Sequence, residues 1–176
     1  MRICVFGASS NDIDPAYIAA GEKLGREMAA AGHELIFGGG QTGLMGAVAR
    51  GMKSGGGKIT GVAPTFFDIP GILYQECNEF IYTETMRERK DLMENKAEAF
   101  IMTPGGIGTM EEFFEIYTLK QLERHSKPIG ILNVNGYYDE LIQMLIHTAE
   151  KGFMDMKCID LFCVNEDPVE LLKQMI

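Results

Sequence analysis

Glu98-Ala-Phe-Ile-Met-Thr-Pro-Gly-Gly-Ile-Gly-Thr-Met-Glu-Glu112 decides the fold, because this one stretch contains a strand, a turn and the start of a helix. The apolar run at its beginning predicts a buried strand that ends before Pro104, and a helical pattern begins near Thr109. The same alternation continues in both directions along the chain, which is typical of a parallel sheet covered by helices. Strands are expected at 2–6, 34–37, 58–63, 79–82, 98–102, 128–132 and 159–164. Helices are expected at 14–31, 43–54, 84–97, 109–124, 136–151 and 167–175. We therefore predict an α/β fold with a doubly wound, mostly parallel sheet of about seven strands flanked by helices.

The composition indicates one globular domain that spans residues 1–176. The chain is 46% apolar, which suits a single sizeable core. Its 16 basic and 25 acidic residues give a formal net charge of −9, so no nucleic-acid partner is expected. The sequence lacks the pattern of a signal peptide, and no apolar run approaches the length that spans a membrane. We expect a soluble, cytoplasmic protein that does not bind membranes.

The cysteines and histidines do not form the pattern of a disulfide framework or a metal site. Cys4, Cys77, Cys158 and Cys163 show no Cys-x-x-Cys spacing, and their mostly apolar surroundings favour buried, reduced thiols. The three histidines lie far apart in the sequence, so we expect no bound metal.

Three glycine-containing turns follow expected strands, and in open α/β sheets ligands bind at the carboxyl ends of the strands. The turns lie at 7–10, 38–43 and 105–109. The second turn matches G-x-G-x-x-G but has no acidic residue about twenty positions later, so a tight turn or a mononucleotide contact is favoured over a dinucleotide site. Gly55-Gly56-Gly57-Lys58 is not a P-loop, because Ile59 and a strand follow it. The irregular stretch 64–78 is a candidate for a loop that closes over a site.

The turn at 104–112 has the composition of an anion-binding loop. Its glycines at 105, 106 and 108 allow backbone N–H groups to converge on a ligand, and the following helix start adds free donors and a partial positive charge. Thr109-x-x-Glu112 also matches a capping box, in which the two side chains only close the helix start. Helical geometry instead places Glu112 on the same shoulder as Ile116, which makes it a catalytic candidate. Both interpretations remain open from the residues alone.

The charged stretch 86–93 offers a similar choice between structure and function. Arg87 and Glu88 fit a solvated helix surface, whereas Arg89 and Lys90 flank an apolar stripe that includes Met86 and Met93. A cation beside an apolar stripe must reach solvent or meet an anion. Arg89 is therefore either a snorkelling surface residue or a residue that faces a ligand.

The motifs Gly38-Gly39-Gly40 with Gly43-Leu44-Met45-Gly46, Arg89-Lys90, and Pro104-Gly-Gly-Ile-Gly-Thr-Met-Glu-Glu112 together resemble those of the LONELY GUY family. These proteins are cytokinin riboside 5′-monophosphate phosphoribohydrolases, and the resemblance runs from the first strand to at least Pro128. It implies a Rossmann-like homodimer without a cofactor, with Arg89 and Glu112 as the catalytic pair. Family members are often labelled lysine decarboxylases, but nothing in the sequence indicates pyridoxal phosphate chemistry. The expected substrate-binding residues are Ser9, Ser10, Gly39, Lys90, Gly105, Gly106, Ile107, Gly108, Thr109, Met110, Glu111 and Thr118.

The implied reaction is hydrolysis of the N-glycosidic bond of AMP or an N6-modified AMP, which yields the free base and ribose 5-phosphate. The small-molecule partner would be this nucleoside monophosphate. One departure concerns the loop after the third strand, where plant members carry a glutamate. Here that position falls near Gly71, with Glu76 as a candidate substitute. The alternative is a nucleotide or molybdenum-cofactor carrier that binds without reaction, because fold does not decide function.

Overall fold

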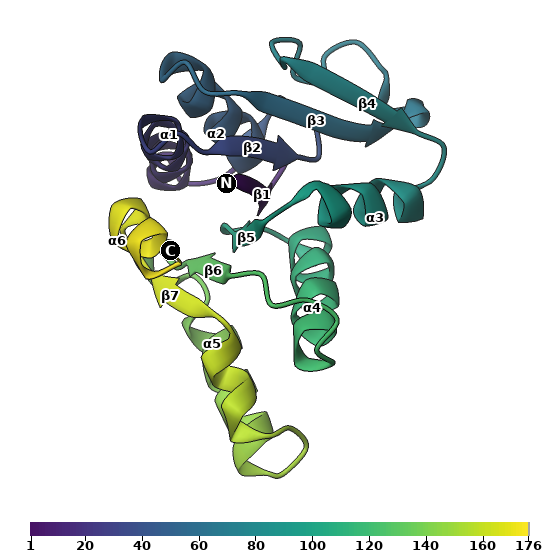
Figure 1. The fold of residues 1–176 in the computed structure, drawn as a ribbon. Coiled ribbons are helices and arrows are strands. Elements are labelled where there is room, and N and C mark those ends of the chain that lie inside the picture. Colours follow the sequence, from purple (N-terminus) through teal and green to yellow (C-terminus); the bar gives the residue numbers. More distant parts are fainter. Residues whose placement is uncertain (176) are drawn as a thin grey trace.

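The computed structural model describes residues 1–175 and shows a seven-stranded sheet in which every neighbouring pair of strands is parallel (Figure 1). The strand order is β4-β3-β2-β1-β5-β6-β7, so the chain builds one half of the sheet outward from β1 and then returns to build the other. The strands are β1 (Arg2–Phe6), β2 (Glu34–Phe37), β3 (Ile59–Pro64), β4 (Glu79–Thr83), β5 (Ala99–Met102), β6 (Ile129–Leu132) and β7 (Cys163–Asn165). The predicted doubly wound α/β fold is confirmed, and the sheet is wholly rather than mostly parallel.

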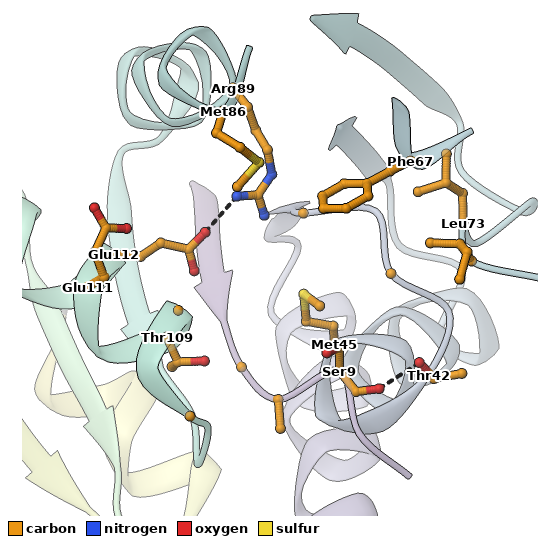
Figure 2. Close-up of a pocket in the computed structure, with 17 residues that line it drawn as sticks. Ser9, Thr42, Met45, Phe67, Leu73, Met86, Arg89, Thr109, Glu111 and Glu112 are labelled. Atoms are coloured by element: carbon orange, nitrogen blue, oxygen red, sulfur yellow. Dashed lines mark hydrogen bonds and ion pairs between the residues drawn. The ribbon is translucent and has the colours of Figure 1, made fainter. Parts of the chain in front are cut away.

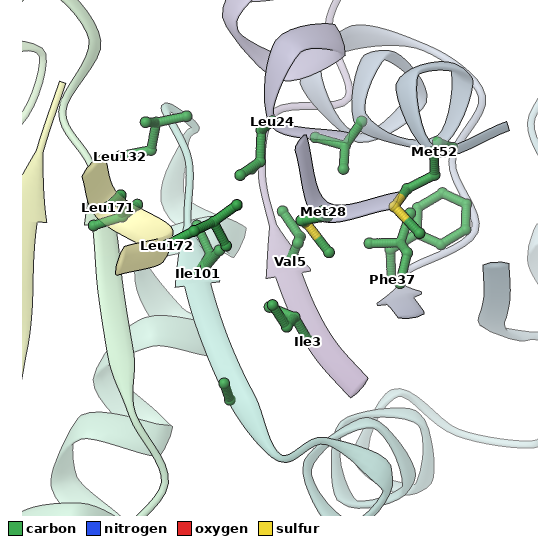
Figure 3. Packing of buried hydrophobic residues seen from close by; sticks show 14 of the residues in the cluster. Ile3, Val5, Leu24, Met28, Phe37, Met52, Ile101, Leu132, Leu171 and Leu172 are labelled. Carbon is green, nitrogen blue, oxygen red and sulfur yellow. The ribbon is translucent and has the colours of Figure 1, made fainter. Parts of the chain in front are cut away.

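Six α-helices cover the two faces of the sheet. They are α1 (Pro15–Ala30), α2 (Gly43–Ser54), α3 (Met86–Lys96), α4 (Ile107–Gln121), α5 (Asp139–Glu150) and α6 (Pro168–Gln174). Leu24 of α1, Met52 of α2 and Leu171 of α6 share one apolar cluster on the first face (Figure 3). Met93 of α3, Phe113 of α4 and Leu145 of α5 belong to the cluster on the other face.

The central strands are continuous apolar runs because both of their faces are covered. In β1, Ile3 and Val5 point into one cluster, whereas Cys4 and Phe6 point into the other. All four of these side chains are at most 5% exposed. This two-sided burial is typical of parallel sheets, and it explains why the strands were recognisable without alternation of polar and apolar residues.

The prediction of a strand at 159–164 was wrong for its first residues. Residues Met156–Leu161 form a 3-10 helix, whose start is capped because the Asp155 side chain accepts a hydrogen bond from the Lys157 amide at 2.9 Å. Strand β7 begins only at Cys163. The expected helix at 136–151 begins later, at Asp139, because a 3-10 turn at Val134–Gly136 precedes it. The expected helix at 109–124 begins earlier, at Ile107, which matters for the site.

Two further findings concern the described residues 1–175. None of their helices is long and apolar enough to cross a membrane. All four cysteines are free thiols, with Cys4 and Cys158 buried and Cys77 and Cys163 partly buried.

Candidate active site

A pocket of about 580 Å³ lies at the carboxyl ends of the central strands. Strand β1 lies between β2 and β5, which are the first strands of the two halves of the sheet. The turns that follow these three strands therefore meet at the point where strand order reverses, where ligands bind in open α/β sheets. Each of the three turns contributes to the lining, through Gly7 to Ser9, Gly38 with Gly40, and Gly106 with Gly108.

The start of α4 presents backbone donors at one wall of this pocket. The helix begins at Ile107 with Gly106 as its N-cap residue, and no side chain in the described part of the chain caps it. The first amide used within the helix is that of Met110, which donates to the carbonyl of Gly106 at 3.1 Å. A Cβ added at Gly106 or Gly108 would meet no atom within 4 Å, so the space before these glycines is open. Free amides at an open helix start suit an anion such as a phosphate.

Glu112 and Arg89 form an ion pair beside these amides (Figure 2). The Arg89 guanidinium donates from Nη1 to Oε1 of Glu112 at 2.8 Å, and its Nε donates to the carbonyl of Val62 at 3.2 Å. The two side chains are only 7% and 12% exposed. Arg89 therefore faces a carboxylate inside the protein, and the interpretation of it as a snorkelling surface residue is wrong.

The sequence around Arg89 explains why its side chain is held in this place. Helix α3 starts at Met86, and the Thr85 side chain accepts from the Glu88 amide at 3.1 Å, while the Glu88 carboxylate accepts from the Glu84 amide at 2.9 Å. This cap fixes the first turn of α3. Opposite Arg89, a Cβ added at Gly38 would lie 1.9 Å from Nη2 of the guanidinium. Glycine at position 38 therefore provides the room that Arg89 occupies.

Burial and the arginine act on Glu112 in opposite directions. Burial raises the pKa of Glu112 above its ordinary value, and the charge and hydrogen bond of Arg89 oppose that rise. The carboxyl group is therefore a weaker acid than a solvated glutamate, while its nearest partner favours the charged form. A carboxylate tuned by burial and one specific partner, inside a pocket, is a typical feature of an active site.

The neighbouring charges form a second, more exposed set. Lys90 contacts the carboxylate of Glu111 and lies 2.8 Å from that of Glu115. Partial burial lowers the pKa of Lys90, but the hydrogen bonds and the charges of the two glutamates together raise it more, so the net shift is upward. Lys90 thus binds the surface of α4, whereas Arg89 binds the residue that faces the pocket.

The pocket also has an apolar wall, which the sequence did not identify. Its residues are Met45, Phe67, Ile72 and Leu73, and Met86 of α3, which lies beside Arg89 (Figure 2). Three of them belong to the irregular stretch 64–78, which was expected to close over a site. Leu73 forms a bridge with Gly40, and the Tyr74 amide donates to the Gly39 carbonyl at 2.8 Å, so this stretch is tied to the turn after β2. The signal available in the sequence was the irregular pattern of this stretch, which indicated a loop near a site but not which of its side chains face the pocket.

The pocket lining includes some of the expected site residues and not others. Both members of the expected catalytic pair line it, together with Ser9, Gly106, Gly108, Thr109 and Glu111. Among the described residues, the lining does not include Ser10, Gly39, Lys90, Gly105, Ile107, Met110 or Thr118. Ile107 is 82% exposed, and Gly105 packs instead against the Thr109 side chain. For all of the expected residues, whether or not they line the pocket, a role in catalysis or substrate binding stays a prediction.

Neither the capping box at Thr109 nor a role for Glu76 in the pocket is found in the part of the chain that the structure describes. The Thr109–Glu112 capping box does not form, because Thr109 lies inside the helix and Glu112 is bonded to Arg89. Glu76, the candidate substitute for the plant glutamate, is 62% exposed and lies 3.6 Å from Lys53. It is not among the pocket residues of the described chain.

The chain is similar to proteins of one known family. A family model described as "Possible lysine decarboxylase" matches residues 45–175. The Arabidopsis thaliana protein "Cytokinin riboside 5′-monophosphate phosphoribohydrolase LOG7" is 37% identical over 174 residues, which cover 99% of this chain and 80% of that protein. The chain belongs to the LONELY GUY family. The rice protein "Probable cytokinin riboside 5′-monophosphate phosphoribohydrolase LOGL5" is 39% identical over 153 residues, which cover 87% of this chain and 62% of the rice protein.

Solved structures agree with the fold of this LONELY GUY family member. The molybdenum cofactor binding protein from Rippkaea orientalis superposes with a TM-score of 0.73 and covers 98% of this chain and 95% of its own. Its sequence is only 21% identical, so the likeness concerns the fold alone.

Proposed function

We propose that the protein hydrolyses the N-glycosidic bond of AMP or an N6-modified AMP, such as a cytokinin riboside 5′-monophosphate. The observation that carries this proposal is the nearly buried Arg89–Glu112 pair, 2.8 Å apart, beside the free amides of α4. The names of the relatives LOG7 and LOGL5 support the same reaction. A site that only held a phosphate would need the amides, but it would not need a buried carboxylate.

The 5′-phosphate is proposed to bind at the amides of Gly106 to Thr109, where the helix start carries a partial positive charge. Binding there fixes one end of the substrate far from the bond that breaks. The energy of that contact can then align the ribose with Glu112.

Glu112 is proposed to act on the anomeric carbon of the ribose. As the bond between the base and C1′ breaks, positive charge develops on the ribose, and a nearby carboxylate stabilises it. The same carboxylate orients a water molecule, whose oxygen bonds to C1′. One proton of this water goes to the departing base, and the other stays on the new C1′ hydroxyl. Arg89 holds the carboxylate in place and favours its charged form.

The base is proposed to lie against the apolar wall formed by Met45, Phe67, Ile72, Leu73 and Met86. A planar purine buries apolar surface there, and an apolar N6 substituent would extend the same contact. The wall therefore supports the inclusion of N6-modified substrates.

The direct test is chromatographic detection of free adenine and ribose 5-phosphate after incubation with AMP, and of the free base from an N6-prenylated AMP. Glu112→Gln keeps the shape of the side chain and an acceptor for Arg89 but removes the charge. We expect turnover to fall by about 10²–10⁴-fold while ribose 5-phosphate still binds. Glu115→Gln, one turn further along α4 and 42% exposed, is the matched control.

Unchanged turnover in Glu112→Gln would refute the role of that residue. If the unmodified protein binds AMP tightly but releases no base from any monophosphate, the protein is a carrier and the proposed reaction is wrong.

We also propose that the protein acts as a homodimer, as its family resemblance implies. Phe66 and Ile69, in the stretch 64–78, expose 54 and 57% of their surface, and such apolar exposure supports an association surface. Sedimentation would test this, and a monomer at all accessible concentrations would contradict it. A cytoplasmic location stays a prediction.

A further inference from the structure

Three consecutive carbonyl oxygens in the loop before α4 each accept a hydrogen bond from outside the loop. The Tyr138 hydroxyl donates to the Thr103 carbonyl at 2.8 Å. The Ala8 amide donates to the Pro104 carbonyl at 3.1 Å, and the Tyr137 hydroxyl donates to the Gly105 carbonyl at 2.9 Å. The carbonyl side of this loop is therefore held by the rest of the protein.

The third of these bonds determines where a pocket amide points. In a planar trans peptide, the C=O of one residue and the N–H of the next point in opposite directions. The bond from Tyr137 to the Gly105 carbonyl therefore sets the direction of the Gly106 N–H. Gly106 lines the pocket, and a Cβ there would meet nothing within 4 Å. Because glycines lie on both sides of this peptide, the local backbone does little to prevent its rotation.

Tyr137 is itself held in one place by its neighbours. It follows the turn at Val134–Gly136, in which Asn135 and Gly136 have positive φ values of 52° and 69°. Its ring packs edge-on against Tyr17, with centroids 5.7 Å apart, and against Tyr138, with centroids 4.8 Å apart. These contacts aim the hydroxyl at the loop while the ring stays 42% exposed.

We propose that Tyr137 is a positioning residue for phosphate binding, because it fixes the Gly105–Gly106 peptide with the Gly106 N–H directed at the anion. This inference rests on the proposed function, in which the α4 amides bind the 5′-phosphate. Tyr137 does not line the pocket among the described residues, so it acts through the backbone rather than by touching the ligand.

The neighbouring tyrosine provides an internal control. The Tyr138 hydroxyl also contacts the Gly105 backbone, which does not line the pocket among the described residues. Its bond to the Thr103 carbonyl is equivalent to that of Tyr137, but the peptide that it holds is Thr103–Pro104. Proline has no N–H, so that peptide has no amide donor to direct. Loss of the Tyr138 hydroxyl leaves a buried carbonyl without its donor and lowers stability, whereas it removes no anion contact.

The test compares Tyr137→Phe with Tyr138→Phe by calorimetric titration with ribose 5-phosphate. Each variant removes one hydroxyl and keeps the ring. Tyr137→Phe should weaken binding by about fivefold, the effect of one hydrogen bond of about 1 kcal/mol, and Tyr138→Phe should leave it unchanged. With AMP, Tyr137→Phe should lower kcat/KM by about the same fivefold. Cleavage of adenosine, which lacks the phosphate, should be the same in Tyr137→Phe and the unmodified protein.

Unchanged ribose 5-phosphate affinity in Tyr137→Phe would overturn the proposal. An equal loss in Tyr138→Phe would also overturn it, because the effect would then be general loosening of the loop. The binding measurement separates this inference from the proposed reaction. If the unmodified protein binds ribose 5-phosphate but releases no base, the reaction is wrong, and the difference between the two variants still decides the role of Tyr137.

Discussion

Replacement of Arg89 by methionine should destabilise the protein in a manner that depends on pH. The substitution keeps an unbranched apolar chain but removes the guanidinium, so the Glu112 carboxylate loses its partner at 2.8 Å and the Val62 carbonyl loses a donor at 3.2 Å. Because Arg89 opposes the effect of burial, its removal raises the pKa of Glu112 further.

The magnitude follows from the burial of the pair, whose side chains are 7% and 12% exposed. Removal of one partner of a buried ion pair costs about 3–5 kcal/mol, because a charge remains unpaired. That loss applies above the raised pKa, where Glu112 must be ionised. As the pH falls below that pKa, the carboxyl group takes up a proton in the folded state, and the penalty decreases until the pH reaches the ordinary pKa of glutamate in the unfolded chain. The loss of stability should therefore be larger at about pH 8 than at about pH 5.

Urea unfolding of the unmodified protein, Arg89→Met and the double variant Arg89→Met with Glu112→Gln would measure this effect. The double variant contains no buried charge at this position, so it should be more stable than Arg89→Met at about pH 8, and the two should converge as the pH falls. A loss that is the same at both pH values, with no recovery in the double variant, would refute the reasoning. Such a result would mean that water solvates the Glu112 carboxylate, although its side chain is only 12% exposed.

Three further predictions test the pocket. Gly38→Ala places a Cβ 1.9 Å from Nη2 of Arg89, so the guanidinium must move. AMP cleavage should then fall by about tenfold or more, and urea unfolding should show a loss of about 1–3 kcal/mol in stability. Unchanged turnover and stability would contradict the close approach. Gly108→Ala adds a methyl group in open space within a helix, so thermal unfolding should show a gain of about 0.5–1 kcal/mol, while titration should show weaker ribose 5-phosphate binding. The acidic limb of kcat/KM for AMP should lie above the ordinary pKa of glutamate, because activity requires the Glu112 carboxylate and is lost as the pH falls through its raised pKa. Glu112→Gln should abolish that limb in any residual activity.

Much of the fold could be predicted because the central strands are buried on both faces. Runs such as Ile3 to Phe6 and Ala99 to Met102 stand out by apolar content alone, and the helices between them force parallel pairing. The same criterion failed near the end of the chain. The expected strand at 159–164 is apolar except for Asp160, but so short a run fits a strand or a helical turn equally well. The cap from Asp155 favours the 3-10 helix for its first half.

The polar wall of the pocket could be predicted from the sequence, whereas the apolar wall could not. The polar wall lies in one stretch of sequence, where glycine content and helical angle indicated the amides and Glu112. The apolar wall depends on contacts between distant segments, such as the bridge from Gly40 to Leu73. Phe67 ends a 3-10 turn of only three residues, Thr65–Phe67, and Ile72 lies outside any helix or strand. Neither residue therefore belongs to an element long enough for its period to reveal where the side chain points. Only the tertiary structure shows that this irregular stretch faces the glycine turn.

The chain contains the pattern Thr-x-x-Glu at the start of two helices, and only one of them forms a cap. At α3, Thr85 precedes the helix and accepts a hydrogen bond from the Glu88 amide at 3.1 Å. At α4, the helix has already begun at Ile107, so Thr109 has a helical backbone and cannot serve as the N-cap residue. Energy favours the same outcome, because a cap is worth about 1 kcal/mol, whereas a buried arginine without its carboxylate costs about 3–5 kcal/mol. Glu112 is thus drawn away from its own helix start by a residue 23 positions earlier in the chain. Because the Glu112 carboxylate is bonded to Arg89, it does not fold back onto the start of α4, and the amides there stay free for a ligand.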